Sequence, residues 1–360
     1  MGNDGWRRKP KAMSLRVFER FLQRAKEHAA AHAVPCVSIT FHGGEPLLQS
    51  PEFFACAAAM AKAELEPVCE VSLAVQTNAV LLNERFIDVF NRHDIVVGVS
   101  LDGAKETNDR ARTFLNGRGS YDQAVAGMAL LKKKCKEELI GGLLAVISVN
   151  DDPIETVEHL VGLGAQSIDF LEPTGHWDRM PPGKAGPEST EYADWLIAVF
   201  DWWFHRHPSL KIRRFENIIE GMLGGYGTVE YFGTEPVTLI TIATDGAYEA
   251  VDQVKSVKNG IEVLSMNVFD DAIDNVLSAS MVSSRQSGLD ALSDKCVACE
   301  FALSCGGGYF PHRYSDVNGF RNPSVYCADY MRLFSHIRTA IEHEIGMDVQ
   351  TKEPSAQPAG

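Results

Sequence analysis

The chain has 360 residues, 45% of them hydrophobic, and a formal net charge of −14 at pH 7. This acidic balance argues against general affinity for nucleic acid or for an anionic membrane surface. No apolar run approaches the length of a membrane span, and the basic start, MGNDGWRRKPKAMS, lacks the apolar segment of a signal peptide. We therefore expect a cytoplasmic protein whose eight cysteines must serve some purpose other than structural disulfides.

Strand and helix patterns alternate between residues 14 and 171. The hydrophobic periodicity predicts strands over residues 36–41, 71–76, 95–101, 143–149 and 167–171. Helices are predicted over 14–33, from Ser50 onward, and over 83–91, 120–134 and 153–163. The second helix opens well, because Ser50-Pro51-Glu52 supplies a cap, a proline and an acid near the positive end of the dipole. This alternation is typical of parallel βαβ units.

Polar or glycine residues follow each of these strands. Gly43, Gly44 and Glu45 follow the first strand, Asn78 follows the second, and Ser100 lies at the end of the third. The glycines let backbone approach a ligand, and a glutamate can accept hydrogen bonds from an ammonium group. Each of these segments alone also fits a turn that ends a strand. Their succession favours a site, because this edge carries the active site in a β/α barrel.

The composition changes after Pro173. Residues 174–189 read as a loop, 191–207 as an aromatic-rich helix that packs in the core, and Asp245-Gly246 as the turn of a hairpin. A last helix is predicted over 328–344. We expect one domain over residues 1–235, a second over 236–347, and a disordered tail over 348–360.

Four cysteines near the C-terminus form a candidate metal centre. Cys296, Cys299, Cys305 and Cys327 read C-x2-C-x5-C-x21-C, and Gly306–Gly308 follow the third cysteine. Convergent thiolates in a glycine-rich loop suit an iron–sulfur cluster, and the same four thiolates suit structural zinc. The other cysteines lie in strand or helix patterns, where each is expected to be a small buried hydrophobe. They are Cys36, Cys56, Cys69 and Cys135.

Taken together, the motifs resemble the radical S-adenosylmethionine (SAM) superfamily with a C-terminal SPASM extension, and within it the FxsB-like group of peptide maturases. The resemblance is carried by Trp6–Pro10, Gly43–Pro46, Gln76–Asn78, Ser100–Gly103, Thr244–Gly246, Gly306–Tyr314 and Asn322–Cys327. It implies an α/β fold, a partial (β/α)6 TIM-like barrel with its first strand missing, followed by a SPASM-like cluster-binding extension.

The resemblance also assigns roles at the strand ends. Gly43, Gly44 and Glu45 would receive the amino group of SAM, while Asn78 and Ser100 suit its ribose hydroxyls. Arg112 would pair with the SAM carboxylate. Arg110 and Arg118 are rivals for that last role.

The defining C-x3-C-x2-C motif of the superfamily is absent from this sequence. The resemblance places it shortly before Trp6, so we expect this chain to lack the ligands of the SAM-cleaving cluster and to bind SAM weakly or not at all. We favour a start codon assigned too late in a longer protein. A decayed or shortened gene would also account for the missing motif, as would a working pseudoenzyme that binds peptide.

At the cysteine loop, the resemblance implies one auxiliary [4Fe–4S] cluster on the four cysteines, with zinc as the alternative. A complete SPASM domain holds a second cluster, but its cysteine positions are occupied here by Val251 and Tyr309. Asp252 matches a catalytic base of sulfatase-maturing relatives, and the alternative is an ordinary exposed aspartate. His312 beside the loop fits either a hydrogen bond that supports the cluster or catalysis.

The expected function is therefore that of a radical SAM/SPASM maturase, an oxidoreductase that oxidises or crosslinks side chains of a ribosomally made precursor peptide. Such an enzyme needs an electron donor protein. Two alternatives are a non-catalytic peptide-binding pseudoenzyme with one iron–sulfur or zinc site, and a SAM-binding enzyme without radical chemistry.

Overall fold

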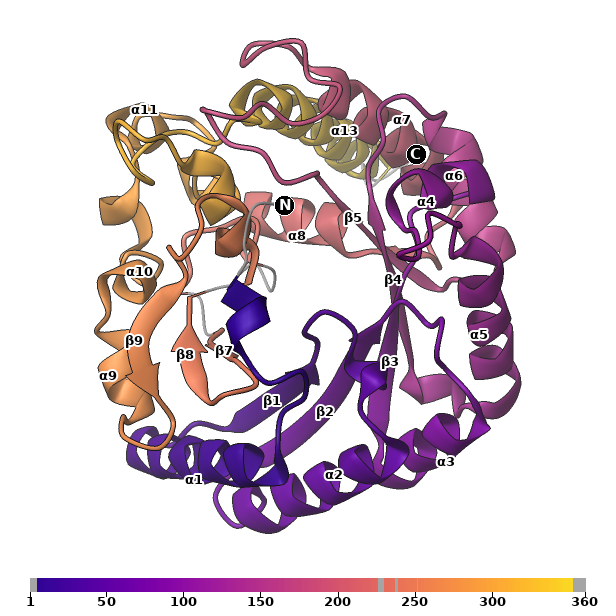
Figure 1. Cartoon of the computed structure of the whole chain (residues 1–360). Coiled ribbons are helices and arrows are strands. Elements are labelled where there is room, and N and C mark those ends of the chain that lie inside the picture. Colours follow the sequence, from indigo (N-terminus) through magenta and orange to yellow (C-terminus); the bar gives the residue numbers. More distant parts are fainter. Residues whose placement is uncertain (1–4, 226–229, 237–238, 251, 352–360) are drawn as a thin grey trace, which may run out of the picture.

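The computed structural model describes residues 5–225, 230–236, 239–250 and 252–351. Six parallel strands form one open sheet in chain order (Figure 1). They are β1 (Cys36–Phe41), β2 (Glu70–Thr77), β3 (Ile95–Ser100), β4 (Ile140–Val146), β5 (Ser167–Leu171) and β6 (Lys211–Ile212). The predicted α/β fold is confirmed. The sheet has two edges, β1 and β6, and does not close into a full barrel.

Helices cover the outer face of this sheet (Figure 1). They are α1 (Leu15–His32), α2 (Pro51–Leu65), α3 (Glu84–His93), α4 (Lys105–Ala111), α5 (Tyr121–Lys134) and α6 (Pro153–Gly162). Side-chain caps start several of them, as the sequence predicts. The Oγ of Ser50 accepts from the Phe53 N–H, and the Asp152 side chain accepts from the Ile154 N–H. Each cap satisfies a backbone donor that the first helical turn leaves unpaired.

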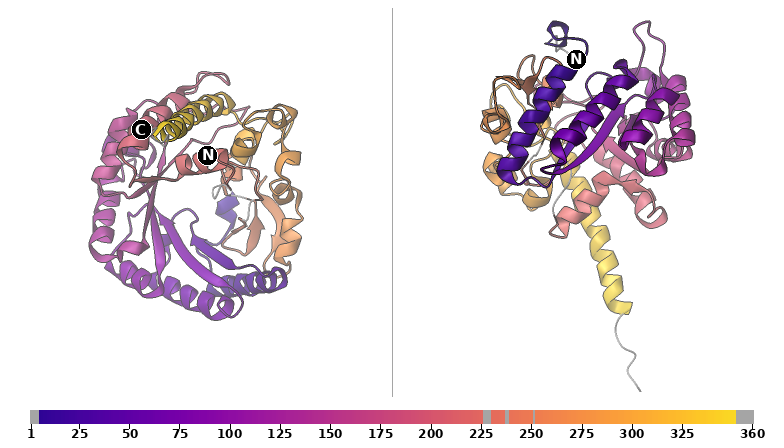
Figure 2. Two further views of the ribbon diagram at one scale, coloured as in Figure 1. Left: turned by 180° about the vertical axis from the view of Figure 1, so that it is seen from behind. Right: turned by 90° about the horizontal axis from the view of Figure 1, so that it is seen from below.

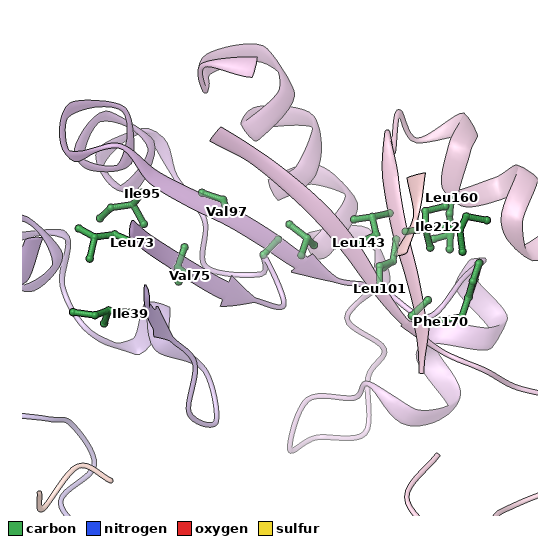
Figure 3. Packing of buried hydrophobic residues seen from close by; sticks show 14 of the residues in the cluster. Ile39, Leu73, Val75, Ile95, Val97, Leu101, Leu143, Leu160, Phe170 and Ile212 are labelled. Carbon is green, nitrogen blue, oxygen red and sulfur yellow. The ribbon is translucent and has the colours of Figure 1, made fainter. Parts of the chain in front are cut away.

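The main core lies between the sheet and these helices. Alternate residues of β2 and β3 are buried there, as Figure 3 shows for Leu73, Val75, Ile95 and Val97. This alternation follows from the period of two in a strand, which sends every second side chain to the helices. Aromatic rings from α2 and α3 complete the layer.

The later part of the chain continues the ring past β6 (Figure 1). An antiparallel sheet contains β7 (Thr241–Ile242), β8 (Ala247–Glu249) and β9 (Val263–Asn267), and its first hairpin turns at Asp245-Gly246, as predicted. The helices are α7 (Glu191–Arg206), α8 (Arg213–Met222), α9 (Ile273–Leu277), α10 (Ser280–Ser283), α11 (Asp294–Val297), α12 (Ala302–Cys305) and α13 (Cys327–Thr351). Six 3-10 helices complete the described elements: η1 (Gly5–Arg8), η2 (Pro46–Leu48), η3 (Glu137–Leu139), η4 (Asp252–Ser256), η5 (Gly288–Ala291) and η6 (Phe310–Arg313).

The C-terminal helix joins the two parts of the chain. α13 packs against α7 and α8 and then extends away from the body (Figure 2). Residues 348–351, placed in the predicted tail, belong to this helix, and residues 352–360 lie outside the described residues. The predicted domain boundary near residue 235 falls between α8 and β7 and stays a prediction. Among the described residues, no helix is both long and apolar enough to span a bilayer.

Gly127 on α5 gives a first testable prediction. A Cβ at this position would lie 2.2 Å from the backbone carbonyl oxygen of Ala79, which cannot move without shifting the loop after β2. We expect Gly127→Ala to lower the free energy of unfolding by about 1–3 kcal/mol through overpacking. Gly162→Ala is the control, since a Cβ there meets no atom within 4 Å. Urea unfolding measures both, and equal stability of the two variants would contradict the prediction.

Candidate functional site

Glu45 connects the loop after β1 to the end of β2. Its Oε1 accepts hydrogen bonds from the Leu47 N–H at 2.9 Å and from the Thr77 hydroxyl at 2.7 Å. Its Oε2 accepts from the Asn78 N–H at 3.0 Å. A carboxylate offers about four acceptor positions. The structure thus brings two predicted residues together and leaves the Glu45 carboxylate one acceptor position for a ligand.

The two glycines before Glu45 leave open space on this edge. Gly43 has a φ of +72°, in the left-handed region that favours glycine. A Cβ at Gly43 or Gly44 would meet no atom within 4 Å, and both residues are exposed. A ligand can therefore approach the backbone of this loop closely. This geometry fits the binding of a small molecule with an ammonium group.

Ser100 belongs to the same edge through Gln76. The Gln76 Nε2 donates a hydrogen bond to the Ser100 Oγ at 3.0 Å, from β2 to β3. The side chain of Gln76 crosses over Gly98, where a Cβ would lie 2.2 Å from its Oε1. Gln76 and Thr77 were not predicted from the sequence as site residues. The available signal was their position directly before Asn78, in the strand-end series.

Arg112 is held by a protein carboxylate. Its Nε and Nη2 donate to the two oxygens of Asp102 at 2.7 and 2.8 Å, and Asp102 also accepts from the Val146 N–H at 3.0 Å. This bidentate pair fixes the guanidinium beside the ends of β3 and β4. Of the rivals, Arg110 pairs with Asp151, and Arg118 lies over the ring of Phe114.

The four predicted metal ligands lie on two short helices, on the turn between them and at the start of the long C-terminal helix. Cys296 is on α11, Cys305 ends α12, Cys327 begins α13, and Cys299 lies between the first two helices. The glycine after Cys305 is required by the local geometry, because Gly306 has a φ of +58° and a Cβ there would lie 1.7 Å from a backbone oxygen of the neighbouring loop. The backbone directly after the third cysteine therefore requires glycine.

The sulfurs share one electrostatic neighbourhood. Burial raises the pKa of the Cys305 thiol to about 12; Arg313 acts to lower it, and the charges of Cys327 and Cys296 contribute to the increase. Burial also raises the pKa of Cys327, and the nearby charges of Cys296 and Cys299 contribute to this increase. A bound metal cation would instead lower the pKa values of these thiols, since it stabilises thiolates. Among the described residues, no three of these sulfurs lie within 4.8 Å of one another, so it is the chemistry of the four thiols that fits a [4Fe–4S] cluster or zinc.

Arg313 supports the glycine loop from its buried side. Its guanidinium donates to the carbonyl oxygens of Gly306, at 2.6 Å, and of Gly308. The nearby charges of Cys305 and Cys296 act to raise the pKa of Arg313, although burial lowers it overall. A cation beside this loop favours a cluster whose thiolates carry net negative charge.

His312 is buried beside the loop without a side-chain hydrogen bond. Its exposed fraction is 1%, and among the described residues neither ring nitrogen has a partner. Burial lowers the pKa of His312 to about 3, so the imidazole is neutral. Its ring lies 5.2 Å from the Tyr309 ring and 4.8 Å from the Tyr326 ring, measured between centroids. Its observed contacts are those of a packing residue.

Two further sequence predictions concern the second cluster and the base. Tyr309 is 2% exposed and stacks on Tyr231 with centroids 4.3 Å apart, so an aromatic pair occupies this position. The backbone of Asp252 begins η4. Val251 and the side chain of Asp252 lie outside the described residues, and the proposed base role stays a prediction.

A buried ion pair connects the sheet to the cysteine segments. Glu172, directly after β5, receives two hydrogen bonds of 2.6 Å from Arg214 on α8, whose Nε donates to the Phe170 carbonyl at 2.8 Å. The guanidinium lies over the rings of Tyr231 and Phe232. Phe232 in turn packs on α13, the helix that begins at Cys327.

The comparisons with known proteins agree with this arrangement. Residues 4–161 match the family model described as the radical SAM superfamily. A cysteine-type anaerobic sulfatase-maturating enzyme of Clostridium novyi is 23% identical over 353 residues, which cover 89% of this chain and 85% of the relative. A serine-type anaerobic sulfatase-maturating enzyme of Bacteroides thetaiotaomicron is 24% identical over 356 residues, with 90% and 81% covered.

Solved structures share the fold over almost the whole chain. The structure described as native anSMEcpe with bound AdoMet has a TM-score of 0.79 at 19% identity, and the match covers 93% of this chain and 90% of that chain. The structure of native anSMEcpe with bound AdoMet and Cp18Cys peptide has a TM-score of 0.78 at 20% identity, with 93% and 92% covered.

Proposed function

We infer that the chain is a radical SAM protein that modifies a side chain of a protein or peptide substrate, because residues 4–161 match the model of that superfamily and a sulfatase-maturating enzyme is similar over 89% of the chain. The observation that carries this proposal is the strand-end site, where Glu45 accepts from the Asn78 N–H and the neighbouring Gln76 donates to Ser100, beside two open glycines. Similar proteins are named sulfatase-maturating enzymes, and one similar structure holds both AdoMet and a peptide. A precursor peptide is the substrate class that fits best.

In this proposal, the residues of the chain bind and orient SAM. Glu45 would receive the ammonium group at its remaining acceptor position, and the exposed backbone of Gly43 and Gly44 would lie against the methionine end. Ser100 and Asn78 would contact the ribose. Arg112, already fixed by Asp102, would turn its remaining Nη1 to the carboxylate. SAM and its cluster supply the radical chemistry when bound, and the protein supplies position and shielding.

We propose one auxiliary [4Fe–4S] cluster on the four cysteines, with Arg313 beside it. The SAM-cleaving cluster has no recognisable ligands in this sequence, because the 360 residues contain no C-x3-C-x2-C motif. Its ligands would have to come from residues outside this sequence. This observation also favours a second candidate, a peptide-binding protein without catalysis. An electron donor protein is required only in the catalytic proposal.

The SAM site is tested by binding. We expect Glu45→Gln to weaken SAM binding about tenfold or more, because the loss of a charge-assisted hydrogen bond costs roughly 1.5–3 kcal/mol. Glu52→Gln is the matched control, since this glutamate is exposed and pairs with Arg85 instead. Calorimetric titration of SAM into each protein measures the effect. Equal affinity in all three proteins would contradict the assignment of Glu45.

Catalysis is tested separately. The protein, purified anaerobically together with any residues encoded in frame before Met1, is incubated with SAM and a chemical reductant, and 5′-deoxyadenosine is measured by mass spectrometry. Formation of this product supports the catalytic proposal. Bound SAM and a loaded cysteine site without this product support the peptide-binding alternative.

A further inference from the structure

A second group of metal-binding side chains lies far from the cysteines in sequence, on the outside of the fold. His28 and His32 project from α1, and Asp274 projects from α9. The Nδ1 of His28 lies 2.6 Å from the Oδ1 of Asp274, and the Nε2 of His32 lies 3.0 Å from the same oxygen. One ligand atom from each residue therefore falls within 4.8 Å of the other two.

The fold holds these side chains together by two independent means. His28 and His32 are four residues apart on a helix, so they share one face, and their ring centroids are 4.5 Å apart. α9 is placed against α1 by Arg24, whose guanidinium donates to the carbonyl oxygens of Val268 and Phe269 just before α9. Figure 1 shows α9 beside α1, and the two helices are in contact.

We propose that His28, His32 and Asp274 form a binding site for one divalent transition-metal ion of the zinc class, with water as the fourth ligand. Two imidazoles and one carboxylate suit zinc, whereas hard cations prefer an all-oxygen set. The site is separate from the four-cysteine centre, and it does not depend on the proposed peptide modification.

The observed distances are close to those of a bound ion. Ligand atoms about 2.0–2.1 Å from a tetrahedral zinc lie roughly 3.3 Å from one another. The observed separations of 2.6 and 3.0 Å would need to open by about 0.7 and 0.3 Å to reach that value. All three side chains can adjust, because their exposed fractions are 22%, 52% and 51%.

The carboxylate of Asp274 faces both imidazoles, and one of its oxygens is hydrogen-bonded to His28 and to His32. On binding, the ion would replace the protons that now join the imidazoles to the carboxylate. The bound ion would then connect a helix of the parallel sheet to the C-terminal part of the chain.

Calorimetric titration of Zn²⁺ into the protein with its cysteine site loaded tests this proposal. We expect the wild-type protein to bind one more Zn²⁺ than His32→Gln, and Asp274→Asn to bind it at least tenfold more weakly. His336→Gln is the control, because His336 pairs with Asp201 at 2.6 Å in an exposed contact that belongs to no three-ligand group among the described residues. Its Zn²⁺ uptake should equal that of the wild type.

Thermal unfolding provides the second measurement. Zn²⁺ should raise the melting temperature of the wild type and of His336→Gln, but not that of His32→Gln, since an ion stabilises only a folded protein that binds it. Equal uptake in the wild type and His32→Gln would overturn the site. Undiminished binding in Asp274→Asn would also overturn it, because the ion would then be held by the two histidines alone. Mg²⁺ should have no effect on the melting temperature of any of these proteins.

Discussion

Replacing Cys305 with serine is expected to prevent binding of the proposed auxiliary iron–sulfur cluster. The wild type, purified without oxygen, should contain about four iron and four sulfide per chain, as one [4Fe–4S] cluster requires. Cys305→Ser should contain less than one of each. Cys305 is the best choice among the four, because it ends α12 and its neighbour Gly306 fixes the loop around it.

Iron, sulfide and zinc analysis measures this prediction, together with the visible absorption of the cluster. Cys56→Ser is the matched control and should leave the iron content unchanged, since Cys56 on α2 is exposed, as is Cys36 on β1. The expectation that these two cysteines are buried is wrong. Near-ultraviolet circular dichroism of metal-free proteins should show the same packing in both variants. A wild type with one zinc and no sulfide would contradict the cluster proposal and support structural zinc.

Much of the parallel sheet could be predicted because its signals are local. The predicted strands over residues 36–41 and 167–171 coincide with β1 and β5, and capping residues mark the helix starts. β4 begins three residues before the predicted start, since it includes Gly141 and Gly142, which carry no strand signal. Glycine is needed here for a tertiary contact, because a Cβ at Gly141 would lie 2.8 Å from the backbone oxygen of Val97 on the neighbouring strand.

The strands that were missed depend on distant contacts. β6 contains two residues and exists through pairing with Ser167 and Ile168. β9 is likewise defined by pairing with β8. A short strand held by such a partner has too little periodicity for a pattern to indicate it. α8 was missed for another reason, because its ten residues are amphipathic at the helical period and the pattern was overlooked.

In the candidate SAM site, too, local motifs could be predicted and contacts between distant residues could not. Glu45 and Asn78 were predicted from the strand-end series, and the structure joins them by a hydrogen bond. The partner of Arg112 was not predicted, because the turn through α4 brings Asp102 back to it. The ligand roles of these residues stay predictions until SAM binding is measured.

The buried pair of Arg214 and Glu172 carries the largest expected effect on stability. We expect Arg214→Ala to lower the free energy of unfolding by about 3–5 kcal/mol, the usual cost of leaving one partner of a buried pair alone. The side chains of Arg214 and Glu172 are 2% and 0% exposed, so water cannot replace the lost hydrogen bonds. The carbonyl of Phe170 also loses its donor.

Urea unfolding without oxygen measures this loss, with the denaturant slope as a check that both proteins unfold in the same way. Arg85→Ala is the control, because Arg85 pairs with Glu52 at 2.5 Å on the surface and its loss should cost less than about 1 kcal/mol. The double variant Glu172→Met with Arg214→Met should be more stable than Arg214→Ala, since no buried charge is left unpaired. A loss below about 1 kcal/mol in Arg214→Ala would contradict the argument.

Arg214→Ala should also weaken the binding of iron and sulfide at the four cysteines. Arg214 lies over Phe232, and Phe232 packs on Tyr330 and Phe334 of α13 with centroids 5.2 Å away in each case. Because α13 begins at Cys327, loosening this contact removes the support of the fourth predicted cluster ligand. We therefore expect Arg214→Ala to lose iron and sulfide under conditions in which Arg85→Ala retains them. Full iron content in a destabilised Arg214→Ala would show that the contact of Arg214 with Phe232 does not support the cysteine site.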